Sequence, residues 1–332
     1  MKVSVIVPVY NSEHTLAACL QACLAQSLGD YEIIVVDDGS TDDSARLARQ
    51  FPVRVVSQPN AGPAAARNRG AAMAAGERLA FTDADCVPRE DWLCQLAGAF
   101  APGVVATGGT YDIANEAALL ARLIHAEILA RHKRFSGEVD FLGSFNVMYD
   151  AAAFHEAGGF DTRFKQASGE DNDLAYRLQD RGGKLLFVPE AAVAHHHPER
   201  LWRYLLTQMR HGYWRVFLYR LHPRRARGDA YAGPLDLLAP PATLLMIAAL
   251  PAMAVAAHLQ GHVLSWGLAM LGIVSIVLLM HVPLGRKVFP GGLSCEWLAF
   301  CAMATLRDLF RAAGLCHGML RFHMLNWRKA AS

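Results

Sequence analysis

Two aspartates one residue apart, Asp83 and Asp85, have the type and spacing needed to hold a divalent metal ion. They follow a short apolar run at residues 79–81. A run that stops abruptly at polar residues is typical of a buried parallel strand, and ligands of open α/β sheets bind just beyond the carboxyl ends of such strands. Two carboxylates there suit Mg²⁺ or Mn²⁺ shared with substrate phosphates. For an isolated Asp-x-Asp pair, a solvated acidic turn is the alternative.

The sequence up to Asp85 alternates apolar runs with helical patterns. Strands are predicted at residues 3–7, 31–36 and 53–56 and in the run before Asp83, and a helix follows each of the first three. This alternation predicts a parallel, doubly wound α/β sheet. The sequence has neither a GxGxxG fingerprint nor a Walker A loop, so a dinucleotide site or a P-loop is not expected.

Short motifs at the predicted strand ends resemble a family 2 inverting glycosyltransferase. They occur in order as Val-Pro-Val-Tyr-Asn, Val-Val-Asp-Asp-Gly-Ser-Thr-Asp, Ala-Arg-Asn and Phe-Thr-Asp-Ala-Asp, and continue in Phe-Asn-Val, Ala-Gly-Gly-Phe-Asp and Gly-Glu-Asp-Asn-Asp-Leu. The resemblance implies a GT-A fold (Rossmann-like, with a mostly parallel sheet), a nucleotide-sugar donor and a divalent metal. We therefore expect a catalytic domain at residues 1–200.

The first motifs assign residues to the donor nucleotide. Pro8, Tyr10 and Asp38 lie at neighbouring strand ends, where an apolar wall and a carboxylate acceptor would meet the base. Arg67 lies near the start of a helix and suits a base or phosphate contact. The resemblance places Asp83 toward the ribose or the metal. It makes Asp85 a direct metal ligand. The alternatives are a helix-packing aromatic for Tyr10 and a surface charge for Arg67.

Glu170 and Asp171 match the Glu-Asp pair of the same family. Inverting transfer requires a general base that deprotonates the acceptor hydroxyl as its oxygen attacks the anomeric carbon. The resemblance implies that Asp171 is this base and that Glu170 positions the acceptor. Acidic residues in a first helical turn also stabilise the helix dipole, which is the alternative.

A predicted strand at residues 187–194 ends in three histidines, His195, His196 and His197. Several GT-A enzymes place a metal-binding histidine here, so the resemblance implies His195 as a ligand, with His197 as the second choice. Along a strand these two share a face, and His196 points away. A loop histidine near bound phosphates is the alternative.

The C-terminal part differs from the rest in charge and hydropathy. Residues 201–332 hold 14 Lys/Arg and 4 Asp/Glu, whereas residues 1–200 hold 18 and 26. An acidic part joined to a basic, apolar part favours attachment to an anionic membrane surface, and nucleic-acid binding would not need the long apolar runs. The 7 cysteines show no CxxC or zinc-ligand spacing and indicate reduced thiols in a cytosolic compartment.

Two apolar stretches, at residues 235–257 and 262–284, have the ~20-residue length that crosses a bilayer. We expect an amphipathic interfacial helix and basic linker at 201–234, two transmembrane helices within 235–284, and an interfacial or re-entrant helix and cytosolic tail at 285–332. Residues 258–261 carry no Lys or Arg, whereas both outer flanks do. The positive-inside rule then places both chain ends in the cytosol, at the inner membrane.

These features predict a membrane-anchored, metal-dependent inverting glycosyltransferase that faces the cytosol. Its expected partners are a nucleotide-diphosphate sugar and a lipid-linked or membrane-delivered acceptor, such as a cell-envelope precursor. One alternative is a nucleotidyltransferase on a similar sheet, but the loop at residues 9–12 lacks the Gly-rich, basic sequence usual there. The other is an inactive family member that serves as a membrane scaffold. The intact set of Asp38, Asp83, Asp85 and Asp171 argues against it.

Overall fold

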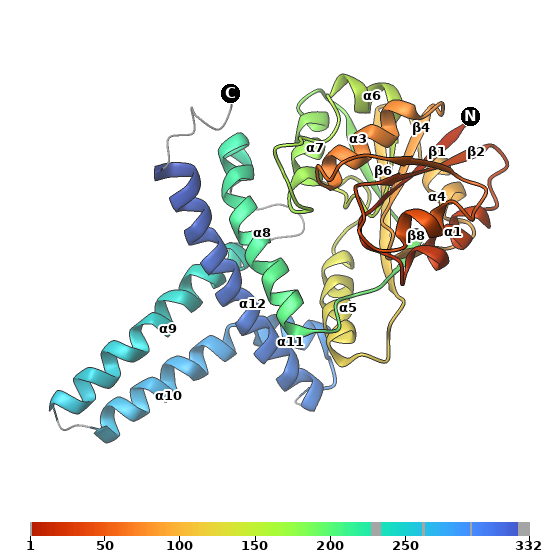
Figure 1. Ribbon diagram of the computed structural model, residues 1–332. Coiled ribbons are helices and arrows are strands. Elements are labelled where there is room, and N and C mark those ends of the chain that lie inside the picture. The colour runs from red at the N-terminus through yellow and green to blue at the C-terminus, as the bar shows by residue number, and fades with distance from the viewer. Residues whose placement is uncertain (1, 227–233, 261–262, 293, 325–332) are drawn as a thin grey trace. The chain divides into compact units, whose positions relative to one another are not determined.

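The chain divides into two compact units, Met1–Pro198 and Glu199–Ser332. The computed structural model describes residues 2–226, 234–260, 263–292 and 294–324. Figure 1 shows strands and helices in the first unit, whereas the described residues of the second form helices and turns.

One eight-stranded sheet spans the first unit in the order β3-β2-β1-β4-β7-β6-β8-β5. The strands are β1 (Val3–Val9), β2 (Tyr31–Asp37), β3 (Arg54–Ser57), β4 (Arg78–Thr82), β5 (Cys86–Pro88), β6 (Val104–Ile113), β7 (Asn146–Asp150) and β8 (Lys184–His195). The first four are parallel, as predicted. Strand β7 runs antiparallel to both β4 and β6, and β5 runs antiparallel to β8, so the other half of the sheet is mixed.

Helices cover both faces of this sheet (Figure 1). The helices of this unit are α1 (Leu16–Leu24), α2 (Ser44–Ala48), α3 (Pro63–Met73), α4 (Trp92–Gly98), α5 (Leu119–His132), α6 (Ala151–Glu156) and α7 (Glu170–Gln179). Alternate residues of β1 face opposite sides. Val5 and Val7 belong to a core cluster with residues of α1 and α4, whereas Ile6 packs with residues of α3, α6 and α7. Gly70 lets α3 lie close to the sheet, because a Cβ there would come 2.4 Å from Ile6 Cγ2.

The second unit contains α8 (Leu201–Leu221), α9 (Pro234–Gln260), α10 (Val263–Leu279), α11 (Val282–Val288) and α12 (Cys295–Met319), with a short 3-10 helix at Pro223–Arg225 and a π-helical segment at Leu320–Met324. Glycines bring α8 and α12 together. A Cβ on Gly212 would lie 2.1 Å from the Arg311 carbonyl oxygen, and one on Gly314 would lie 1.9 Å from that of Met209. Only glycine permits backbones to approach this closely.

Among the described residues, one helix is long and apolar enough to cross a membrane, at Leu238–Ala256 within α9. The second predicted span, 262–284, is not one helix: α10 ends at Leu279 and α11 begins at Val282. Pro283 explains the break, since it has no N–H to donate within a continuous helix but fits the first turn of a new one. The apolar stretch after residue 295 forms the single helix α12, in which Arg307 and Asp308 are both buried.

Candidate functional site

The carboxyl ends of β1, β2 and β4 meet at one edge of the sheet, because Val9 pairs with Asp37 and Ile6 pairs with Phe81. Pro8 is buried within β1, and Tyr10, just beyond it, is 50% exposed.

Asp38 follows β2 and is buried with both carboxylate oxygens bonded. One oxygen accepts hydrogen bonds from Gln58 Nε2 at 2.7 Å and Ala61 N at 2.9 Å, and the other accepts one from Gly62 N at 2.9 Å. Gly62 has a φ of +95°, and a Cβ there would lie 2.7 Å from the Lys165 carbonyl oxygen. Asp38 therefore fixes the loop that starts α3.

Arg67 is a buried cation that joins two parts of the predicted site. Its side chain is on α3 and is 1% exposed. One terminal nitrogen donates to Asp83 Oδ1 at 2.8 Å, and the other donates to Glu170 Oε1 at 2.9 Å. We predicted a base or phosphate contact for Arg67, but the structure pairs both terminal nitrogens with carboxylates. Arg67 and Glu170 are thus directly hydrogen-bonded, although they are 103 residues apart in the sequence.

Helix α7 carries Glu170, Asp171 and Asp173 in its first turn, where carboxylates complement the helix dipole. Glu170 is buried, and its second oxygen accepts a bond from Ser168 N at 2.7 Å. Burial and the adjacent charge of Asp171 raise the pKa of Glu170 to about 7, although Arg67 opposes the shift. Asp171 is half-buried, and its Oδ1 accepts a bond from Asn172 N at 2.8 Å.

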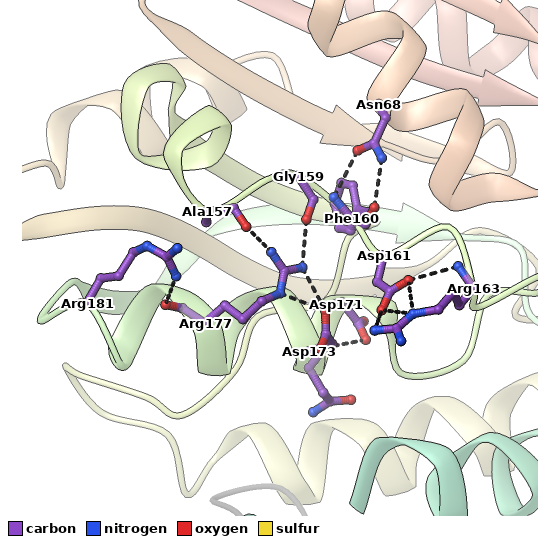
Figure 2. A network of polar contacts seen from close by, with 11 residues as sticks. Asn68, Ala157, Gly159, Phe160, Asp161, Arg163, Asp171, Asp173, Arg177 and Arg181 are labelled. Atoms are coloured by element: carbon purple, nitrogen blue, oxygen red, sulfur yellow. Dashed lines mark hydrogen bonds and ion pairs between the residues drawn. The ribbon is translucent and has the colours of Figure 1, made fainter. Parts of the chain in front are cut away.

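A loop at residues 157–161 is held between α3 and α7 (Figure 2). Asn68, next to Arg67, donates to the Phe160 carbonyl at 2.7 Å and accepts from Phe160 N at 2.9 Å. From α7, Arg177 donates to the carbonyl oxygens of Ala157 and Gly159 and pairs with Asp173. The sequence motifs included Asn68 but gave Arg177 no role. The pair of Arg177 with Asp173 has a local signal in its i,i+4 spacing, whereas the bonds from Arg177 to Ala157 and Gly159 have none.

Asp85, just beyond β4, and His195, the last residue of β8, lie together. His195 Nε2 is 3.5 Å from Asp85 Oδ2, and His195 Nδ1 is 3.1 Å from His197 Nδ1. Burial raises the pKa of Asp85; His195 opposes this shift, and the charge of Asp83 adds to it. Burial and the neighbouring imidazoles lower the pKa of His197 to about 2, so that ring is neutral. Of the two predicted ligands, His195 is the one that faces Asp85.

Cys86 adds a sulfur to this pair of residues, which sequence reasoning missed. One ligand atom from each of Asp85, Cys86 and His195 lies within 4.8 Å of the others. Oxygen, nitrogen and sulfur donors at this spacing fit a divalent metal ion. Asp83 is near Asp85, but one of its oxygens is already bonded to Arg67.

Comparisons with known proteins agree with the fold and the motifs. Residues 4–157 match the model of "Glycosyl transferase family 2". The chain is 34% identical to the pre-mycofactocin glycosyltransferase of Mycobacterium tuberculosis over 212 residues, which cover 60% of this chain and 43% of that protein. It is 40% identical to glycosyltransferase AglE of Haloferax volcanii over 99 residues, 27% of this chain and 33% of that protein. The chain thus spans less than half the length of these relatives.

The fold is shared with a solved structure, mannosyltransferase PcManGT from Pyrobaculum calidifontis in complex with GDP-Man and Mn²⁺. The TM-score is 0.57 at 18% identity, over 96% of this chain and 86% of that chain. The prediction of a GT-A fold followed by a helical region is confirmed.

Proposed function

We propose that this protein transfers a sugar from a nucleoside diphosphate donor to an acceptor hydroxyl, with inversion at the anomeric carbon. The observation that carries the proposal is the bridge from Arg67 to both Asp83 and Glu170. It ties the end of β4, where two carboxylates suit a metal-bound diphosphate, to the acidic first turn of α7. The residues that bind the donor and those that activate the acceptor would then be neighbours in one site. The family 2 match over residues 4–157 supports the same class of reaction.

For the donor diphosphate we propose a Mn²⁺ or Mg²⁺ ion held by Asp85 and His195, with Asp83 beside them. The ion would act as a Lewis acid on the leaving diphosphate. The residues fit this role, because Asp85 offers an oxygen and His195 a ring nitrogen toward the same point. The complex of PcManGT with GDP-Man and Mn²⁺ supports this class of donor and ion.

For the donor base we propose the edge formed by Pro8, Tyr10 and Asp38. The exposed ring of Tyr10 offers an apolar surface to a flat base. Since both oxygens of Asp38 are bonded to the loop before α3, we propose that Asp38 acts mainly by shaping that loop. Arg67 would likewise hold Asp83 in place and leave the diphosphate charge to the metal.

For the chemical step we propose Asp171 as the general base. Asp171 is half-buried and thus open to an acceptor, whereas Glu170 is buried against Arg67. A general base that deprotonates the hydroxyl as it attacks the anomeric carbon typically accelerates the reaction ~10²–10⁴-fold. Glu170 is paired with Arg67 and precedes Asp171 in the chain. It would position the acceptor by fixing where Asp171 lies.

We further propose that α9 and α10 form a two-span anchor in the inner membrane, with the catalytic domain in the cytosol. Leucines along both helices are exposed, among them Leu245 at 71% and Leu264 at 79%, as expected for a lipid-facing surface. With 17 residues, α10 is ~25 Å long, slightly less than the ~30 Å hydrocarbon core. Such an anchor supports a lipid-linked or membrane-delivered acceptor.

A panel of nucleotide sugars with the purified protein tests the proposed reaction. Sugar transfer releases a nucleoside diphosphate, whereas a nucleotidyltransferase releases pyrophosphate. An inactive scaffold releases neither. The donor that yields nucleoside diphosphate identifies the base and the sugar. Release of pyrophosphate, or no release from any donor with Mn²⁺ or Mg²⁺ present, would overturn the proposal.

A further inference from the structure

Cys86 and His195 are direct neighbours across two antiparallel strands. Cys86 begins β5, His195 ends β8, and the two residues pair in register. Side chains of a directly opposite pair have Cβ atoms only ~4.5–5.5 Å apart. Asp85 precedes Cys86, and the thiol donates a weak hydrogen bond to Asp85 Oδ1 at 3.7 Å. The backbone pairing therefore brings sulfur, nitrogen and oxygen to one point.

The spacing of these donors is close to that of ligands in a tetrahedral zinc site. With ordinary bond lengths of ~2.0 Å to oxygen or nitrogen and ~2.3 Å to sulfur, neighbouring ligand atoms lie about 3.3–3.6 Å apart. The structure gives 3.7 Å from Asp85 Oδ1 to Cys86 Sγ and 3.5 Å from Asp85 Oδ2 to His195 Nε2. These two distances run to different oxygens of Asp85, and one ligand atom from each residue lies within 4.8 Å of the others, so the side chains must close in to meet one ion.

A second, independent observation is the orientation of His195. Its Nδ1 lies 3.1 Å from Nδ1 of His197, which is 4% exposed. When His195 donates through Nδ1, its Nε2 presents a lone pair toward Asp85. Histidines that bind metals almost always have such an outer partner for the second ring nitrogen. In that tautomer His195 Nε2 is available to a metal ion beside Asp85.

The three donors differ in what they prefer. Carboxylate oxygen suits Mg²⁺ and Mn²⁺, whereas thiolate favours Zn²⁺ and other softer ions. We propose that Asp85, Cys86 and His195 form a zinc site in which Cys86 binds as a thiolate, so that Zn²⁺ displaces the Mn²⁺ or Mg²⁺ held by Asp85 and His195. Binding breaks the S–H bond, forms a Zn–S bond and releases one proton to solvent. Zinc binding by these three residues is independent of the function proposed above, whereas the displacement of Mn²⁺ or Mg²⁺ rests on the metal site proposed there.

Co²⁺ is the probe for the thiolate, because it takes the place of Zn²⁺ and gives a sulfur-to-cobalt charge-transfer band. We expect the metal-free full-length protein to develop this band with one equivalent of Co²⁺ and to lose it when Zn²⁺ is added. The variant Cys86→Ser, whose side chain is nearly isosteric, should bind Co²⁺ without showing the band. The control is Cys94→Ser, since Cys94 on α4 is half-buried and bonded to Ser27. A wild-type complex without the band, or a band that persists in Cys86→Ser, would overturn the proposal.

Displacement of Mn²⁺, followed by electron paramagnetic resonance, gives a second measurement. Zn²⁺ should release bound Mn²⁺ from the wild type and from Cys94→Ser at equal concentrations. For Cys86→Ser we expect at least ~10–100-fold more Zn²⁺ to be needed, since even outer partners of a ligand contribute that much to affinity. Equal Zn²⁺ requirements in all three proteins would contradict the zinc site. Neither measurement uses sugar transfer. The Co²⁺ band needs no bound Mn²⁺, so it tests the zinc site even if the Mn²⁺ site proposed above fails.

Discussion

Replacing Arg67 with methionine tests the ionic bridge that joins β4 to α7. The guanidinium is 1% exposed and bonds Asp83 at 2.8 Å and Glu170 at 2.9 Å. Methionine fills much of the same space but supplies neither charge nor hydrogen-bond donor. Glu170 would then stay buried without its cation, although the Ser168 N–H would still bond its other oxygen.

The expected loss follows from the burial of each carboxylate. Removing one partner of a buried pair typically costs ~3–5 kcal/mol, because the remaining charge is uncompensated. The Glu170 side chain is only 2% exposed, so its charge would remain desolvated. The Asp83 side chain is 31% exposed, so water can solvate its charge. We therefore expect the free energy of unfolding to fall by ~3–5 kcal/mol, with most of the loss due to Glu170.

The loss should depend on pH in one direction. The pKa of Glu170 is raised from 4.5 to about 7 in the folded protein, and it rises further without Arg67. The folded state then binds more protons than the unfolded state, so stability is lost as pH rises from 4.5 through the folded pKa. Arg67→Met should be least harmful at the acid end of this window and most harmful above about pH 7.

Hydrogen exchange of the purified full-length protein measures this loss in peptides from β1 and β4. A cost of ~3–5 kcal/mol corresponds to roughly 10²- to 10⁴-fold faster exchange, since 1.4 kcal/mol is tenfold. Arg46→Met is the matched control, because Arg46 pairs with Asp43 at 69% and 61% exposure; it should exchange as the wild type does. Identical exchange in the two variants, or a loss that shrinks as pH rises, would refute the bridge.

Four further predictions concern the proposed site and the anchor. Asp85→Ala should abolish transfer, as should chelator until Mn²⁺ or Mg²⁺ returns; full activity in chelator would rule out the metal. Asp171→Asn should slow transfer ~10²–10⁴-fold while calorimetry shows nearly unchanged binding of nucleoside diphosphate, and a near wild-type rate would exclude Asp171 as the base. His197→Leu should weaken Mn²⁺ binding ~10–100-fold, whereas His197→Asn, whose Oδ1 replaces Nδ1, should recover most of it; equal losses would mean only a packing role. In a cysteine-depleted protein, a thiol at Gln260 should react from outside spheroplasts and one at Ser332 should not, and the reverse would contradict the hairpin.

The positions of Asp38, Asp83 and Asp85 were predictable because they rest on local pattern. Apolar runs that end in carboxylates define parallel strands, and parallel strands bring their carboxyl ends to one edge. The register of β1 with β2 and β4 shows that edge. Strands β6 and β7 were not predicted. The antiparallel pairing of β7 between β4 and β6 depends on contacts distant in sequence.

The contacts that assemble the site could not be predicted for the same reason. Arg67 and Glu170 are 103 residues apart, and Asn68 and Phe160 are 92 apart. No periodicity or turn signal specifies which carboxylate a buried arginine will pair with. The pairing of Cys86 with His195 is likewise a matter of strand register. The sequence showed which residue types were available, but only the three-dimensional pairing determines which of them are neighbours.

The bridge at Arg67 also bears on why the site is built from charges. A buried ion pair adds little net stability over an apolar core of similar volume, since desolvation offsets most of the attraction. Its structural value lies in geometry, because a planar guanidinium donates in fixed directions and bonds two carboxylates at once. Asp83 is thereby oriented beside Asp85, and Glu170 sets the start of α7 beside Asp171. Lysine at position 67 would keep the charge but offer a single point donor. If fixed direction is what matters, Arg67→Lys should retain more stability than Arg67→Met and yet lose transfer activity to a similar extent.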